Sequence, residues 1–269
     1  MIPKLKLENL ELSKMVCGTN QFVAITHRWN PLDMLAHVIR FRDSKTVAKF
    51  MIFLQQEYGV NCCVSSPRDK VYEAIQITEK ETGEDFHWIC TPSRRRSADG
   101  IEPDIWKQID WCVDHNVSVC GPHRSYTDKC INYDSLEIGG TGEKYPPLGE
   151  ITEYIRDRDM IPMISTHYIE TIEAVEKQGY DIKLIIQPLN QIGFESNTEP
   201  EKLIEKINST DLQILNIKPM AAGRLSPDVL TWNLENIKDN DFLAVGFGKY
   251  KYCVEDAKII DDFLSNNSP

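Results

Sequence analysis

Short apolar stretches alternate with longer stretches of helical periodicity along the whole chain. The stretch over 32–58, for example, places Leu35, Ile39 and Val47 at helical spacing, and Gly59 ends it. This alternation is the pattern of βα units arranged around a parallel sheet. It predicts a protein of the α/β class.

The short apolar stretches predict eight strands, over 12–17, 61–65, 86–91, 117–120, 162–165, 182–187, 213–218 and 242–246. Helical stretches separate consecutive strands, as over 70–80, 148–157 and 199–207. Eight βα repeats favour a closed (β/α)8 barrel, the TIM barrel. A doubly wound open sheet is the rival fold, but the glycine-rich fingerprint expected after its first strand is absent.

Length and composition predict a single domain over 1–269. A TIM barrel typically takes ~250 residues. The hydrophobic fraction of 41% and the charged fraction of 26% are near the averages of globular proteins. Turn-forming residues accumulate only in the long segment at about 124–147, which includes Gly139 and Gly140. Because long barrel loops are usually functional, we expect this segment to lie over the catalytic mouth.

Charge and hydropathy narrow the range of partners and compartments. A net charge of −11 argues against nucleic acid, since phosphate binding is driven by Lys and Arg. No apolar run reaches the ~18 residues that a membrane helix needs. The first residues alternate charged and apolar side chains, unlike a signal peptide, so we expect a cytoplasmic protein that binds a small-molecule substrate. The eight cysteines are expected to be buried thiols. The oligomeric state is not predicted.

Several segments, in order and over nearly the whole chain, resemble aldo/keto reductases, especially predicted oxidoreductases related to iron–sulfur-containing members. Residues 10–19 resemble the family's opening strand, which ends in Gly-Thr, and residues 58–63 resemble its second strand. The ends of its fifth to eighth strands are similar to Ile164–His167, Gln187–Asn190, Ile217–Arg224 and Ala244–Gly248. The resemblance implies a (β/α)8 barrel and NADP-dependent carbonyl reduction.

The resemblance also implies a catalytic set that is mostly missing here. The family uses a tyrosine acid, a lysine and an aspartate that tune it, and a histidine that orients the carbonyl. Val64 stands where the aspartate belongs, the following loop has no tyrosine, and Pro92 replaces the lysine. Only His123 fits its position. We therefore expect this chain not to follow the family's route of reduction.

The nucleotide side of the resemblance is mixed, because the serine–arginine phosphate signature that usually follows the last strand is absent. Ser165 and Gln187 match positions that hold the nicotinamide amide in the family. Gly246, Gly248 and Lys249 follow the last strand, where barrels of many functions bind anions. NADP is therefore one predicted cofactor.

Three histidines predict a different cofactor. His27, His123 and His167 follow the first, fourth and fifth predicted strands, at the catalytic end of a barrel. Neutral imidazoles that converge can bind a divalent metal ion and leave positions open for a substrate. The alternative is three independent histidines without a common ligand.

Lys218 ends the seventh predicted strand, directly before Pro219. Burial at the mouth would lower its pKa and make it a base or a Schiff-base amine. The alternative is an electrostatic contact to an anion or a loop carbonyl.

Together these residues predict an enzyme that acts on a small polar hydroxy or carbonyl compound, sugar-like in one version, by acid–base chemistry. His123, His167 and Lys218 are its predicted catalytic residues, with or without a metal, in a lyase, isomerase or epimerase. Two alternatives stay open. One is an NADPH-dependent oxidoreductase with a substitute proton donor such as Tyr126, and the other is a non-catalytic ligand-binding barrel.

Overall fold

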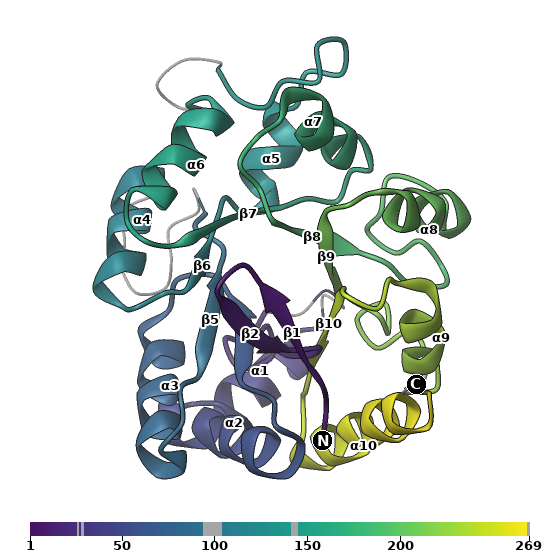
Figure 1. The fold of residues 1–269 in the computed structure, drawn as a ribbon. Helices are drawn as coiled ribbons and strands as arrows, with labels where there is room; N and C mark the ends of the chain where they lie inside the picture. The colour runs from purple at the N-terminus through teal and green to yellow at the C-terminus, as the bar shows by residue number, and fades with distance from the viewer. Residues whose placement is uncertain (26, 28–29, 94–103, 141–144, 268–269) are drawn as a thin grey trace.

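A closed barrel of parallel strands forms the centre of the computed structural model, which describes residues 1–25, 27, 30–93, 104–140 and 145–267 (Figure 1). Its strands are β3 (Met15–Gly18), β4 (Cys62–Ser65), β5 (His87–Cys90), β6 (Val119–Cys120), β7 (Ile161–Ser165), β8 (Leu184–Pro188), β9 (Gln213–Ile217) and β10 (Phe242–Gly246). Each strand pairs in parallel with the next, and β10 also pairs with β3, which closes the sheet. The structure thus confirms the predicted (β/α)8 barrel.

Helices surround the barrel and connect its strands (Figure 1). They include α2 (Ser44–Tyr58), α3 (Asp69–Thr82), α4 (Ile105–Asp114), α6 (Leu148–Arg156), α7 (Glu170–Gln178), α8 (Pro200–Ser209), α9 (Val229–Asn236) and α10 (Tyr250–Asn266). Helices α1 (Pro31–Arg40) and α5 (Arg124–Cys130) follow β3 and β6. None of the helices in the described part of the chain combines the length and the apolar character that a bilayer span requires.

The predicted continuous helix over 32–58 is wrong, because the chain forms α1 and α2 with a break between them. The side chain of Asp43 accepts a hydrogen bond from the backbone N–H of Thr46 at 2.8 Å, which caps a new helix. Gly59 ends α2 in the left-handed conformation, with φ 72°. A local polar cap therefore outweighs an apolar periodicity that continues across the break.

Apolar side chains fill the barrel interior, because every second residue of each strand points inward. The buried interior residues on the strands are Val16, Cys62, Ile89, Val119, Ile161, Met163, Leu184, Ile186, Leu215, Phe242 and Ala244. An antiparallel hairpin of β1 (Lys4–Leu7) and β2 (Leu10–Ser13) covers one end of the barrel and adds its apolar side chains to this interior (Figure 1). The interior is thus a packed core, and ligands must bind at the opposite end.

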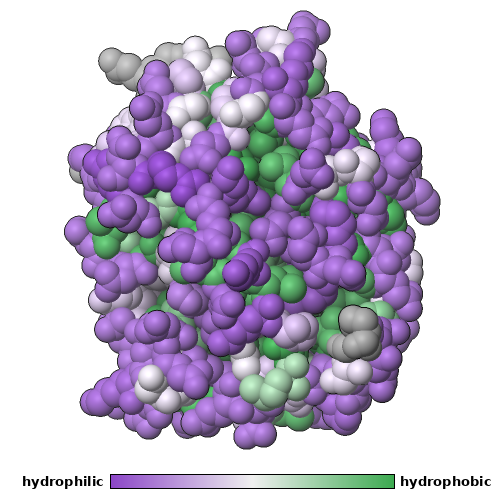
Figure 2. All heavy atoms as spheres, viewed as in Figure 1, coloured by the Kyte–Doolittle hydropathy of each residue, from purple (hydrophilic) through white to green (hydrophobic). Residues whose placement is uncertain are grey.

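Arg156, at the end of α6, fastens the hairpin to the barrel wall. Its guanidinium donates to both carboxylate oxygens of Glu8, at 2.7 and 2.9 Å, and to both of Asp181, at 2.8 and 3.1 Å. Bidentate pairs of this kind fix geometry as well as adding energy. Polar side chains predominate on the face that carries the hairpin (Figure 2).

All eight cysteines are buried free thiols, as the sequence predicts. Burial raises the pKa of Cys62, for example, to about 12. Thiols of this kind are unreactive because the thiolate is the nucleophile. The cysteines therefore act as small core residues.

Candidate active site

A lysine, two histidines and a glutamate meet at the carboxyl ends of the barrel strands. Lys218 directly follows β9, and its Nζ atom lies 3.0 Å from Nε2 of His167, which follows β7. The same Nζ atom lies 2.8 Å from Oε2 of Glu195. The Lys218 and His167 side chains are only 10% and 8% exposed. The amine is thus held between two partners in a largely buried place.

Glu195 joins loops from two sides of the barrel. It belongs to the segment between β8 and α8, and its Oε1 atom lies 2.9 Å from Nδ1 of His27 in the segment after β3. Its Oε2 atom, which pairs with Lys218, is also 3.8 Å from Nδ1 of His167. We refer to Lys218, His167, Glu195 and His27 as the mouth cluster.

Glu195 is not among the predicted site residues, although the sequence carries a signal for it. Glu195 is the only carboxylate between Asp181 and Glu199, and it follows a strand of the barrel. Lys218 is predicted to lie at the barrel mouth, so a lone acid in a loop at the same end of the barrel is a candidate counter-ion for its amine.

The backbone at the mouth cluster is strained. Lys218 and Glu195 both have φ 60°, in the left-handed region that residues other than glycine seldom occupy. Each such residue costs on the order of 1 kcal/mol and tends to occur where function requires a defined geometry. The left-handed backbone at these two residues positions the side chains that form the 2.8 Å ion pair.

Burial and charge set the protonation states of the cluster. Burial, reinforced by the charge of Lys218, lowers the pKa of His167 to about 2, so the imidazole is neutral. Burial also lowers the pKa of Lys218, while Glu195 acts in the opposite direction. For Glu195, burial alone would raise the pKa, but the hydrogen bond from His27 and the charge of Lys218 outweigh it and hold the pKa below its usual range. An ammonium group on Lys218 therefore donates to a carboxylate and to a neutral imidazole.

Helix α5 supports His167 from behind. Asp128 accepts hydrogen bonds from the backbone N–H of His167 at 3.1 Å and from the hydroxyl of Thr166 at 2.9 Å. Arg124 lies 3.8 Å from the other carboxylate oxygen of Asp128, and its charge contributes to the lowered pKa of His167. The segment after β6 thus positions a residue that follows β7.

His123 is the N-cap of α5. Its Nδ1 atom accepts a hydrogen bond from the backbone N–H of Ser125 at 3.1 Å, which places the ring proton on Nε2. His123 lies close enough to His167 to contribute to the lowering of that residue's pKa. The structure therefore brings the predicted catalytic residues His123, His167 and Lys218 to one end of the barrel.

The donor set does not fit the predicted metal ion. His27 and His167 both face Glu195, and the amine of Lys218 lies where a cation between these groups would be. Across the described ranges, no group of three or more His, Cys, Asp or Glu side chains is placed to hold a metal ion. The structure does not bring His27, His123 and His167 into such a group, since order along the sequence does not determine distances.

The predicted nicotinamide contacts lie on different sides of the sheet. Ser165 is buried at the end of β7, in line with the inward-facing Met163. Gln187 alternates with the inward-facing Ile186 and so points out of the barrel, fully buried, with neither amide atom hydrogen-bonded. Gln187 therefore does not present its amide to the mouth.

The predicted phosphate site after β10 is filled by the chain's own side chains. A Cβ atom on Gly246 would clash with the amide of Gln21, and one on Gly248 would lie 3.1 Å from Nε2 of His37. Arg40 donates a hydrogen bond to the carbonyl of Gly248. Residues of α1 and of the segment before it therefore lie close against both glycines.

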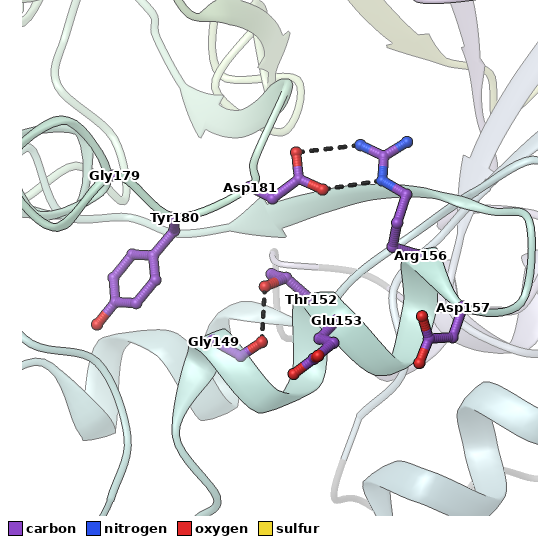
Figure 3. A pocket seen from close by; sticks show the side chains of 8 residues that line it. All are labelled: Gly149, Thr152, Glu153, Arg156, Asp157, Gly179, Tyr180 and Asp181. Carbon is purple, nitrogen blue, oxygen red and sulfur yellow. Dashed lines mark hydrogen bonds and ion pairs between the residues drawn. The ribbon is translucent and has the colours of Figure 1, made fainter.

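A pocket of about 350 Å³ lies on the outer surface beside α6 and the turn before β8 (Figure 3). Arg156 lines it, but its guanidinium is already paired with Asp181 and with Glu8. The guanidinium of Arg156 is therefore already engaged and does not attract an anion to this pocket. The mouth cluster, which combines a buried base with charged partners, is the stronger candidate site.

Comparison with known proteins bears on the fold. Neither models of known protein families nor curated protein sequences match this chain. Among solved structures, it is similar to a Pseudomonas aeruginosa protein classed with the aldo-keto reductases, with 15% identity, a TM-score of 0.63, and coverage of 97% of this chain and 95% of that chain.

Two further structures give the same result. A glycerol dehydrogenase from Gluconobacter oxydans is 12% identical, with a TM-score of 0.56 and coverage of 99% of this chain and 96% of that chain. The protein Gox0644, in a complex with NADPH, is 10% identical, with a TM-score of 0.59 and coverage of 98% and 92%. At these identities the likeness shows the fold alone, a barrel shared with these structures over nearly the whole chain.

Proposed function

We propose that this chain is an enzyme that performs acid–base chemistry on a small polar carbonyl or hydroxy compound at the mouth of the barrel. The observation that carries the proposal is the amine of Lys218, held 3.0 Å from His167 and 2.8 Å from Glu195. Buried titratable groups with perturbed pKa values concentrate at functional sites, and TIM-barrel enzymes place them at this end.

The reaction class that fits these groups is proton transfer at a carbon next to a carbonyl. Once its extra proton is lost to water, Lys218 is a base, and its amine is held 3.0 Å from the neutral imidazole of His167. His123 carries its ring proton on Nε2 and would donate to the carbonyl oxygen. A base and a proton donor at one site suit an isomerase, an epimerase or a lyase.

The alternative of an NADPH-dependent reductase is less well supported. Its suggested proton donor, Tyr126, is fully buried, and its hydroxyl donates to the backbone carbonyl of Pro146. Burial raises the pKa of Tyr126 well above its usual value. Tyr126 is therefore a structural residue that fastens the segment after α5.

The test follows proton exchange in heavy water. A panel of hydroxyketones, aldoses and 2-oxo acids is incubated with the full chain, and 1H NMR detects loss of the protons next to the carbonyl, epimerisation or cleavage. Lys218→Met and His167→Gln should each reduce exchange on the order of 10²-fold. Lys206→Met, which removes an amine paired with Glu176 away from the mouth, is the matched control. Absence of exchange across the panel favours the ligand-binding alternative.

A further inference from the structure

Lys218 has the position of a nucleophile as well as that of a base. Lys218 follows strand β9 at the barrel mouth, and its side chain is 10% exposed. Its amine lies 2.8 Å from Glu195 and 3.0 Å from His167. We infer that this amine forms an imine with the carbonyl carbon of the substrate. The inference rests on the proposed function and gives it a covalent step.

The step balances without an oxidant or a reductant. Lys218 first loses its extra proton to water, and the neutral amine adds to the carbonyl carbon as the C=O electron pair moves to oxygen. One further amine proton reaches that oxygen, which also takes up a proton from water. The oxygen then leaves as water, and the C=N bond remains. Partial burial favours this step because it stabilises the neutral amine over the ammonium.

Arg124 adds a requirement on the substrate. It begins α5 beside the mouth cluster, and its side chain is 38% exposed. Its ion pair with Asp128 is long, at 3.8 Å. A guanidinium in this position suits a carboxylate or a phosphate. The substrate class is therefore a small aldehyde or ketone that carries an anionic group.

Trapping with cyanoborohydride tests the inference. Pyruvate, glyoxylate and dihydroxyacetone phosphate are each added to the full chain, and peptide mass spectrometry locates the reduced adduct. We expect Lys218 to be modified at least tenfold more than any other lysine. Lys14 is the matched control, because it is also largely buried, at 5% exposure, and donates to the carbonyls of Lys238 and Asp239, but lies before the amino end of β3, at the opposite end of the barrel.

The outcomes separate the two proposals. Proton exchange without an adduct on Lys218 overturns the imine and leaves the proposed function standing. Absence of both overturns both. Equal labelling of Lys14 and Lys218 also overturns the imine, because it reflects general amine reactivity. Lys218→Arg, whose fold is checked by circular dichroism, should abolish the adduct while retaining the charge.

A second inference concerns α1, whose apolar side faces solvent. Its polar residues His37 and Arg40 contact Gly248 at the barrel rim, and no residue of α1 is buried. The outer side carries Leu32, Met34, Leu35, Val38 and Ile39, which are 41 to 75% exposed and which we call the α1 patch. A surface helix normally has the reverse orientation, and concentrated exposed apolar residues mark an interaction site.

We propose that the α1 patch binds the α1 patch of a second copy. No charged residue lies within the patch, and Asp33 lies in the first turn of the helix, whereas Arg40 turns inward to the carbonyl of Gly248. Arg42, just beyond the helix, is 81% exposed. An antiparallel pair around a twofold axis brings the acidic start of one helix to the basic end of the other. The surface is therefore complementary to itself, as a twofold interface requires.

Sedimentation velocity of the full chain tests this proposal. We expect a dimer at high concentration that dissociates on dilution, and a monomer for Leu35→Glu combined with Ile39→Glu. Ile192→Glu is the control, because Ile192 is also 54% exposed but lies in another loop. A wild-type monomer at every concentration overturns the proposal, and so does a dimer that survives the double substitution. Binding of a monomer to phosphatidylglycerol vesicles would assign the patch to a membrane surface instead.

Discussion

The amine of Lys218 lies 3.0 Å from Nε2 of His167, and this distance couples the protonation states of the two groups. Nε2 accepts a hydrogen bond only while the imidazole is neutral in this tautomer. Protonation of His167 would put two positive groups at the same distance inside a buried site, beside the carboxylate of Glu195. The arrangement therefore depends on pH.

Stability should fall in mild acid because of His167. Burial and the charge of Lys218 hold its folded pKa at about 2, whereas an ordinary histidine has 6.5. Between these values the unfolded chain binds more protons, so the free energy of unfolding decreases as the pH falls below about 6.5. We expect a loss on the order of 2 kcal/mol from pH 7 to pH 5.

Urea denaturation at both pH values measures this loss. His167→Gln cannot take up the proton and should flatten the dependence between pH 7 and pH 5, even if it is less stable overall. His115→Gln is the control, because that histidine stacks on Trp111 away from the mouth. An unchanged slope in the His167 variant would contradict the assignment.

Glu195→Gln should show that Lys218 needs a counter-ion. The substitution leaves a largely buried ammonium without its carboxylate, which should cost about 2 kcal/mol and lower the pKa of Lys218 further. Lys218 reacts with trinitrobenzenesulfonate only as the neutral amine, so its reactivity should begin to rise at a lower pH in the variant. In the double variant with Lys218→Met the loss should be partly recovered, because the unpaired charge is gone. Strictly additive losses would show that the pair is not coupled.

Gly121→Ala should be severely destabilising. A Cβ atom at this position would overlap the backbone carbonyl group of Met163 on the neighbouring strand β7. Backbone cannot rotate away as a flexible side chain can, so the strands must separate at a cost of roughly 3 kcal/mol or more. Gly149→Ala is the control, since nothing lies within 4 Å of its Cβ position. Thermal denaturation compares the two, and similar midpoints would contradict the predicted overlap.

The fold could be predicted because the spacing of apolar residues along each strand and helix reflects which side of that element is buried. His167 and Lys218 could be placed at the mouth from strand order alone, since the carboxyl ends of all barrel strands share one face. Glu195 could be suspected as a lone acid at the same end, but its contact with Lys218 could not be predicted, because it depends on a left-handed backbone that no pattern encodes. The α1 periodicity correctly indicates a helix over most of 32–40, but it does not say which side faces solvent.

The cofactors could not be predicted from position for the same reason. Three histidines after three strands share an end of the barrel, yet a metal needs them within one coordination sphere. The amine of Lys218 and the carboxylate of Glu195 stand between His27 and His167. Side-chain contacts between segments distant in the chain decide such a site.

Arg156→Ala should loosen the hairpin without affecting chemistry at the mouth. It removes a guanidinium bonded to both Glu8 and Asp181, and the partners are partly exposed, so we expect a loss of only about 1 kcal/mol. Arg158→Ala, which removes a comparable surface cation paired with Asp110, is the control. Hydrogen exchange should accelerate in the hairpin, 4–13, and not near Lys218. Loss of proton exchange on the substrate panel would contradict this separation of roles.

NADPH should not stabilise the wild-type chain. Gln21 and His37 fill the space beside Gly246 and Gly248, and Arg40 fastens α1 to the carbonyl of Gly248. A ligand that binds only the folded state at a hundred times its Kd adds about 2.7 kcal/mol, which a thermal-shift assay detects readily. We therefore expect no rise in Tm at millimolar NADPH, with NADP and ATP as matched anions. A rise specific to NADPH would require α1 to move off the rim, and would restore the reductase alternative that the resemblance implies.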